Sequence, residues 1–170
     1  CFFMGYSDYC CNRYKTSMNY ITEVKFDERA DGDDIPVSID SKNPTLMLEV
    51  GFDIVNASDI IWLHGVVVLD HEYESDIEDG EEGREEDNAN ITIVIQKVSS
   101  LMKDPKPIYT LEVDLAPRSD DVAIPFSHIS TETEILRDVR YRVVVYSDRM
   151  NEEDVDIEGP NTLMAIRFTK

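Results

Sequence analysis

The sequence predicts an all-β protein, an antiparallel β-sandwich or jelly roll of about eight strands. Apolar and polar residues alternate over short segments, and turn-forming residues separate these segments. The strand–helix–strand rhythm of a parallel α/β fold is missing from the sequence, which favours an antiparallel sandwich. The chain has 170 residues, 42% of them hydrophobic, which suits one globular domain.

The first half of the chain contains three predicted strands. Met18–Phe26 alternates among strand-forming residues, and an acidic turn follows it. Thr45–Val55 carries an apolar residue at every second position, which is typical of a strand with one buried face. Ile60–Leu69 is a nearly continuous apolar run, which predicts a strand buried on both faces with His64 in the core.

The second half begins with a charged loop, Asp70–Asn88, and then contains five more predicted strands. Pro125 lies within one of these and predicts an edge strand, because proline cannot donate a backbone hydrogen bond. Thr131–Val139 is the one predicted helix, since Thr131 and Glu134 fit a capping box. The five strands are Ile91–Val98, Pro107–Leu115, Val122–Ile129, Tyr141–Tyr146 and Thr162–Thr169.

All three cysteines lie among the first eleven residues, at Cys1, Cys10 and Cys11. Adjacent cysteines rarely pair with each other, because a disulfide needs Cα atoms about 5.5 Å apart and a specific torsion. The rest of the chain offers no thiol as a partner, so we expect inter-subunit cross-links. We divide the chain into a connector arm (residues 1–18) and a β-sandwich domain (residues 19–170).

The arm is rich in aromatic residues, and we expect four of them to dock on a neighbour: Phe2, Phe3, Tyr6 and Tyr9. Exposed apolar segments mark interaction sites, and an extended peptide can complete the sheet edge of another subunit. A head-to-tail contact of this kind builds a filament unless a ring closes. The alternative is that the arm packs on its own sandwich as an extra strand.

The formal net charge of −20 argues against a nucleic-acid partner, which needs a basic patch, and against anionic membrane surfaces. No apolar run reaches the ~18 residues of a membrane span. Eleven carboxylates lie between Asp70 and Asp87, which indicates either a solvated loop or a calcium site without EF-hand spacing. We expect no other cofactor.

The sequence contains no catalytic or nucleotide-binding motif, so we expect a protein that is not an enzyme. The three histidines, His64, His71 and His128, stand apart and show no spacing typical of metal ligands. Neither a catalytic residue nor a metal ligand is therefore assigned.

Tyr9-Cys10-Cys11, followed by the spacer Asn12–Ser17 and a cysteine-free β-sandwich, resembles the subunits of bacterial endospore appendage fibres. The resemblance implies a jelly roll whose N-terminal connector reaches into neighbouring subunits. That family carries a further cysteine about a dozen residues on, where this chain has Tyr20. If the family role holds, Cys10 and Cys11 pair with arm cysteines of neighbours, including Cys1, or with a different protein.

The leading hypothesis is therefore a structural subunit of a self-assembling extracellular or spore-surface fibre, a homopolymer joined by strand complementation and inter-subunit disulfides. One alternative is a closed trimeric jelly-roll binding module of the tumour-necrosis-factor or C1q kind, or a carbohydrate-binding sandwich. Another is an arm whose neighbouring thiolates react or bind soft metals.

Overall fold

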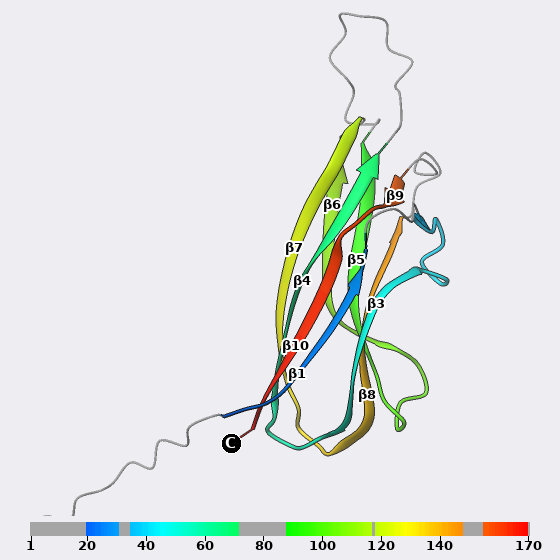
Figure 1. Cartoon of the computed structure of the whole chain (residues 1–170). Coiled ribbons are helices and arrows are strands. Elements are labelled where there is room, and N and C mark those ends of the chain that lie inside the picture. The colour runs from blue at the N-terminus through cyan, green and yellow to red at the C-terminus, as the bar shows by residue number, and fades with distance from the viewer. Residues whose placement is uncertain (1–19, 31–34, 72–87, 117, 148–154, 170) are drawn as a thin grey trace, which may run out of the picture.

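The computed structural model describes residues 20–30, 35–71, 88–116, 118–147 and 155–169 (Figure 1). These residues form ten β-strands, which confirms the predicted all-β class. None of the described ranges contains a helix long and apolar enough to cross a membrane. The strands are β1 (Tyr20–Arg29), β2 (Ile35–Pro36), β3 (Thr45–Val55), β4 (Ile60–His71), β5 (Ala89–Val98), β6 (Lys106–Leu115), β7 (Ser119–Thr131), β8 (Leu136–Ser147), β9 (Val155–Ile157) and β10 (Asn161–Thr169).

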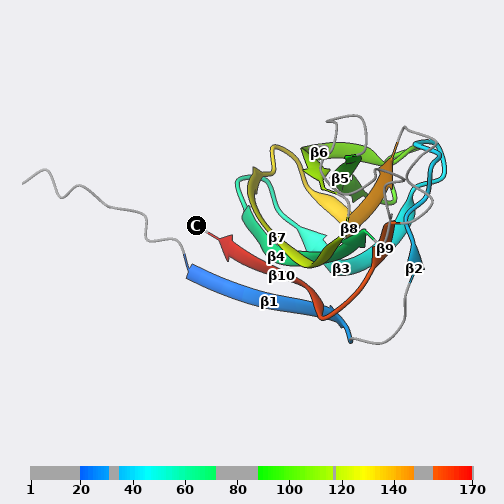
Figure 2. The same cartoon turned by 90° about the horizontal axis from the view of Figure 1, so that it is seen from above.

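The strands form two antiparallel sheets that pack face to face (Figure 2). The front sheet, nearest the viewer in Figure 1, has the order β1-β10-β4-β7, and the short strands β9 and β2 continue it beside the end of β4. The back sheet has the order β3-β8-β5-β6. The eight long strands correspond to the eight segments that the sequence predicts.

The long strands pair in a nested order that defines a jelly roll. The first pairs with the last (β1 with β10), and the next pairs inward are β3 with β8, β4 with β7 and β5 with β6. Rolling up such a nested ladder places alternate pairs in opposite sheets, as in a double Greek key. Contacts between residues far apart in sequence therefore hold every layer of the fold together.

The core fills the space between the sheets with the inward-facing residues of both. Leu63 and Leu163 contribute from the front sheet, and Ile93 from the back sheet, all fully buried. Phe52 and Tyr141 meet edge to face with ring centroids 6.3 Å apart.

The predicted helix at Thr131–Val139 is wrong, because the chain there turns and enters strand β8 at Leu136. Leu136 and Val139 are both buried, and their spacing of three residues imitates a helical repeat. In the structure Asp138 adopts a φ of 49°, a left-handed conformation that aspartate tolerates. This local twist lets both apolar residues face the core from a strand.

The prediction that Ile60–Leu69 is buried on both faces is also wrong over most of its length. Ile61, Leu63 and Leu69 face the core and are fully buried, while Trp62 on the opposite side is 37% exposed. The strand lies at the centre of a sheet whose outer side is uncovered within the described structure. His64 lies on that outer side rather than in the core.

Gly65 lies where neighbouring strands leave no room for a side chain, which predicts a steep stability loss in Gly65→Ala. A Cβ atom there would overlap the carbonyl oxygen of Thr162 and lie 2.8 Å from Cζ of Phe126. We expect urea unfolding to show a loss of about 3 kcal/mol or more, at the upper end of overpacking effects.

Gly51→Ala is the matched control, because a Cβ there meets its nearest atoms at an ordinary 3.5 Å. We expect it to change stability by less than about 1 kcal/mol. Equal losses in the two variants would contradict the packing described for Gly65.

Candidate functional site

The outward side of the front sheet is apolar where an antiparallel sheet face in contact with water is normally polar. Residues opposite each other on paired strands point to the same side of a sheet. The register therefore places Val24, Ile166, Trp62 and Ile129 in one row that crosses all four long strands. The row combines residues from both ends and the middle of the chain.

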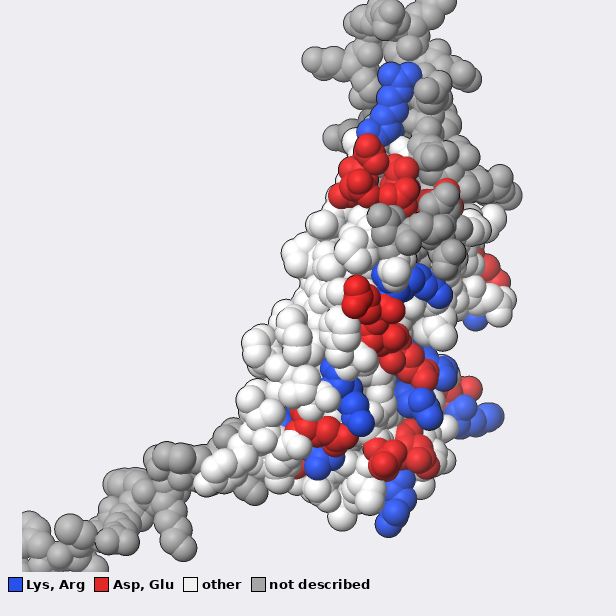
Figure 3. Space-filling model, in the orientation of Figure 1, with Lys and Arg blue, Asp and Glu red and all other residues white. Residues whose placement is uncertain are grey.

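We call this surface the outer face. Glu28, opposite Thr162 near the end of β1, is the one charged side chain in these rows of described residues, and Figure 3 shows a broad white area bordered by charged residues. The other members of the outer face are Ile21, Val24, Phe26, Ile60, Trp62, His64, Val66, Ala123, Pro125, Ser127, Ile129, Thr131, Thr162, Met164, Ile166 and Phe168.

Several large apolar side chains of the outer face are open to solvent. Val24 is 52% exposed, Phe26 56% and Ile129 63%. The Trp62 indole lies among them, where its Nε1 donates a 2.9 Å hydrogen bond to Oγ of Ser127 on the neighbouring strand. Contiguous exposed apolar surfaces are typical of interaction sites, so the outer face is a candidate for one.

Strand β1 turns its charged side inward, toward the edge of β3. The carboxylate of Asp27 accepts a 2.8 Å hydrogen bond from the backbone N–H of Glu49. Glu23 lies 3.3 Å from the guanidinium of Arg167, which also lies 3.6 Å from the buried carboxylate of Asp59. These inward contacts leave the apolar side of β1 facing out, as part of the outer face.

A second candidate site is a hollow of about 710 Å³ between the β5–β6 connection and the end of β7. We call it the base pocket. Its lining residues are Lys97, Leu101, Met102, Lys106, Pro107, Ile108, His128, Ile129, Ser130, Thr131, Glu132, Thr133, Glu134 and Leu136.

The buried carboxylate of Glu132, only 3% exposed, forms the floor of this pocket. It accepts hydrogen bonds from Nζ of Lys97 at 2.7 Å, Oγ of Ser130 at 3.0 Å and Oη of Tyr141 at 3.1 Å. Burial, together with the charge of Glu132 and the hydrogen bond to it, raises the pKa of the Tyr141 hydroxyl, which therefore stays protonated and donates.

The structure keeps the three histidines apart. His64 lies on the outer face, and His71 is buried with Nδ1 3.1 Å from the carbonyl oxygen of Ala116. His128 lies at the base pocket with its ring centroid 5.7 Å from that of Tyr109, and burial lowers its pKa. Among the described residues, no group of three or more His, Cys, Asp or Glu side chains could hold a metal ion.

The predicted arm and most of the predicted calcium loop lie outside the described residues. The calcium site and the arm therefore stay predictions, and so do the arm's cross-linking and docking roles. The arm residues concerned are Cys1, Phe2, Phe3, Tyr6, Tyr9, Cys10 and Cys11.

Sequence reasoning missed the outer face. The signal was present in β10, where Leu163 and Ala165 alternate with Met164, Ile166 and Phe168, so that both sides of the strand are apolar. A single strand of this kind predicts a buried location. Only the pairing of the strands shows that its second apolar side reaches the surface.

No protein-family model matches the sequence, and no curated protein matches it. Among solved structures, the VP2 subviral particle of infectious bursal disease virus is similar in fold, with a TM-score of 0.47 and 12% identity over 85% of this chain. The chain spans about a third of the length of the viral chains it matches.

Two other similar structures are close to this chain in length. Eiger TNF from S. frugiperda has a TM-score of 0.43 and 9% identity over 86% of this chain and 94% of that chain. The C-terminal domain of EclA, a sugar-binding protein, has a TM-score of 0.39 and 10% identity over 93% of this chain and 89% of its own. The jelly-roll assignment rests on the strand pairing of this chain.

Glu132→Gln should strongly destabilise the fold, because it leaves the Lys97 ammonium, 12% exposed, without its counter-charge. We expect a loss of about 3 kcal/mol or more in urea unfolding. Adding Lys97→Met should recover part of that loss, since the unpaired charge is then removed.

Glu49→Gln is the control, because Glu49 pairs with Arg140 and Arg142 in a more exposed setting. Its loss should stay near 1 kcal/mol or below. If Glu132→Gln lowers the free energy of unfolding no more than the control does, the Lys97–Glu132 pair does not stabilise the fold. The same conclusion would follow if the double variant regains none of the lost free energy.

Proposed function

We propose that the protein is a structural subunit that assembles with copies of itself, and that it is not an enzyme. One contact is made by the outer face against the outer face of a second copy. The other is made by the N-terminal arm, which reaches a further copy. The observation that supports the proposal is an outer face with a single charged side chain, Glu28, on a chain whose net charge is −20.

Charge selects a second copy as the partner of this face. Two chains with a net charge of −20 repel each other, so the electrostatic repulsion is smallest where neither contacting surface carries a charge. Apart from Glu28 near its border, the outer face is such a surface, and the same holds for a second copy of it. Packing two sheet faces about 10 Å apart repeats the arrangement inside the sandwich itself.

The size of the face suits a modest interface. Four strands about 4.8 Å apart span about 19 Å, and the residues from Ile60 to Val68 of β4 span about 30 Å. Each copy would then cover about 600 Å², or about 1,200 Å² in total, the lower end of specific interfaces. A second contact is needed to make the assembly extend and persist.

The N-terminal arm supplies this second contact in our proposal. Within the described structure β1 pairs only with β10, so its other edge offers free backbone groups along Tyr20–Arg29. The edge of β7 also lies open but contains Pro125, which interrupts pairing. An arm from another copy that adds beside β1 would continue the outer face with its aromatic side chains.

A face contact that joins two copies and an arm contact that is head to tail together allow a fibre to grow. Cys1, Cys10 and Cys11 would lock the arm contacts as disulfides, which places the fibre outside the cell or on a spore surface, in an oxidising environment. The resemblance of the arm to endospore appendage connectors supports the same reading. The strong negative charge elsewhere limits side-by-side aggregation.

Ile129→Glu should weaken self-association without harming the fold, because this exposed side chain lies in the central row of the outer face. We expect sedimentation velocity to show association weakened by about thirtyfold or more, the factor that corresponds to a 2 kcal/mol hot spot. Val24→Glu, at the other end of the row, should act in the same way.

Ile135→Glu is the matched control, because Ile135 is 59% exposed, close to the 63% of Ile129, but lies outside the outer face. It adds the same charge and should leave association unchanged. Equal weakening by Ile135→Glu would show that charge alone, and not the outer face, governs association.

Deletion of residues 1–17 should stop growth beyond the face-to-face pair, because the arm contact is lost. Electron microscopy should show fibres for the full chain and small particles for the truncated one. Non-reducing gels should show linked subunits that separate only with reductant. A truncated chain that forms the same particles as the full chain would favour the closed trimeric module instead.

A further inference from the structure

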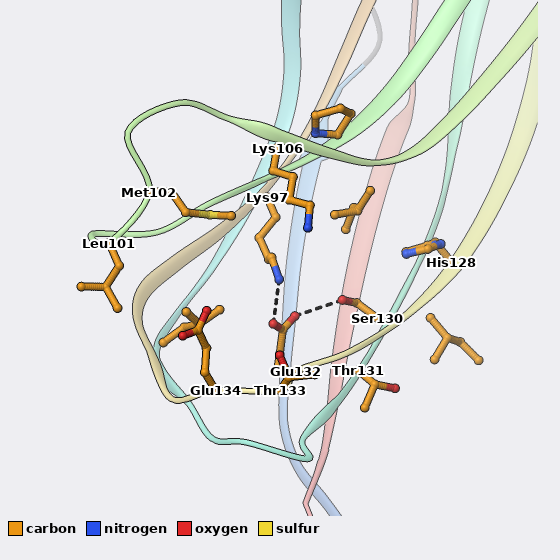
Figure 4. Close-up of a pocket in the computed structure, with 14 residues that line it drawn as sticks. Lys97, Leu101, Met102, Lys106, His128, Ser130, Thr131, Glu132, Thr133 and Glu134 are labelled. Atoms are coloured by element: carbon orange, nitrogen blue, oxygen red, sulfur yellow. Dashed lines mark hydrogen bonds and ion pairs between the residues drawn. The ribbon is translucent and has the colours of Figure 1, made fainter.

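The base pocket has the size and the wall chemistry of a small-molecule site. Its volume of about 710 Å³ lies within the range of ligand pockets, and apolar side chains such as Ile108 and Leu136 line it beside a few polar groups. It opens at the end of the sandwich where β6 and β7, the edge strands of the two sheets, come together (Figure 4). Of its lining residues, only Ile129 and Thr131 also belong to the outer face.

The polar groups of the pocket offer donors rather than acceptors. The carboxylate of Glu132 already accepts three hydrogen bonds, from Lys97, Ser130 and Tyr141. An ammonium group has three N–H donors, and Lys97 uses one of them on Glu132. The acceptor at the floor is thus satisfied while its cationic partner keeps donor capacity.

Lys106 adds a second positive charge to the pocket, and unlike Lys97 it has no carboxylate partner among the described residues. Within the part of the chain that the structure describes, Lys106 forms no ion pair. Figure 4 shows its side chain extending into the same space as that of Lys97, with both amino groups inside the pocket. Glu134 also lines the pocket, and Figure 4 shows its carboxylate on the loop side of Glu132, without a dashed line to either lysine.

We propose that the base pocket binds a small organic carboxylate. Its anionic group would lie between the amino groups of Lys97 and Lys106, and its apolar body against Ile108 and Leu136. A charge-assisted hydrogen bond to an ammonium is about twice as strong as a neutral one, so the head group provides the specificity.

The remaining polar residues fit this ligand. Burial lowers the pKa of His128 and so favours its neutral imidazole, which leaves the positive charge of the pocket to the lysines. The distant carboxylates of this acidic chain would repel the ligand, but at 0.15 M salt charges beyond about 8 Å are largely screened. Because Glu132 offsets the charge of Lys97, the attraction for the head group comes mainly from Lys106, which forms no ion pair among the described residues.

The test uses the full chain and three probes of equal length: hexanoate, hexan-1-ol and hexylamine, at pH 7 and 0.15 M NaCl. Isothermal titration calorimetry should give a dissociation constant for hexanoate at least tenfold lower than those of the alcohol and the amine. Equal binding of the alcohol, or no binding of 20 mM hexanoate, would overturn the proposal.

Lys106→Met should weaken hexanoate binding by tenfold or more, and the fold should survive because Lys106 is exposed. Lys103→Met is the control, since Lys103 is an exposed lysine on the same connection but does not line the pocket. If both variants weaken binding equally, the charge of the chain and not the pocket attracts the ligand, and the proposal fails.

Discussion

The nested antiparallel pairing of the strands is the constraint on which the rest of the structure depends. Because the first long strand pairs with the last, the segments around residues 24 and 166 become neighbours. The pairing of β10 with β4, and of β4 with β7, then adds Trp62 and Ile129 to the same row. Alternate residues of each strand face the core. The same register therefore determines which side chains lie together on the outer face.

The apolar outer face contrasts with the strongly acidic composition of the chain. A protein with a net charge of −20 keeps most of one sheet face free of charged side chains, although the inward side of its edge strand carries Asp27 and Glu23. Reversing β1 would bury its apolar side chains and expose its charges. The inward contacts with Glu49 and Arg167 hold it in the opposite orientation, so the fold maintains an apolar surface that its own core does not use.

The sequence was sufficient for the fold class and for the positions of the eight long strands, because period-two alternation is a local property of each segment. It was not sufficient where the pattern depends on a partner. The spacing of Leu136 and Val139 imitates a helix until the positive φ of Asp138 is known. His64 reads as a core residue until the pairing of β4 places it on the outer side. The base pocket likewise brings together Lys97 of β5 and Glu132 of the β7–β8 connection, a contact that no local pattern contains.

The central claim is that the outer face is covered when copies of the chain assemble, and Trp62, the only tryptophan, reports on it directly. Acrylamide quenching of its fluorescence should be measured across a concentration series, with light scattering to follow assembly. The account predicts that quenching falls and the emission shifts to shorter wavelength as scattering rises, because the half-exposed indole becomes buried. Assembly that leaves the quenching of Trp62 unchanged would contradict it.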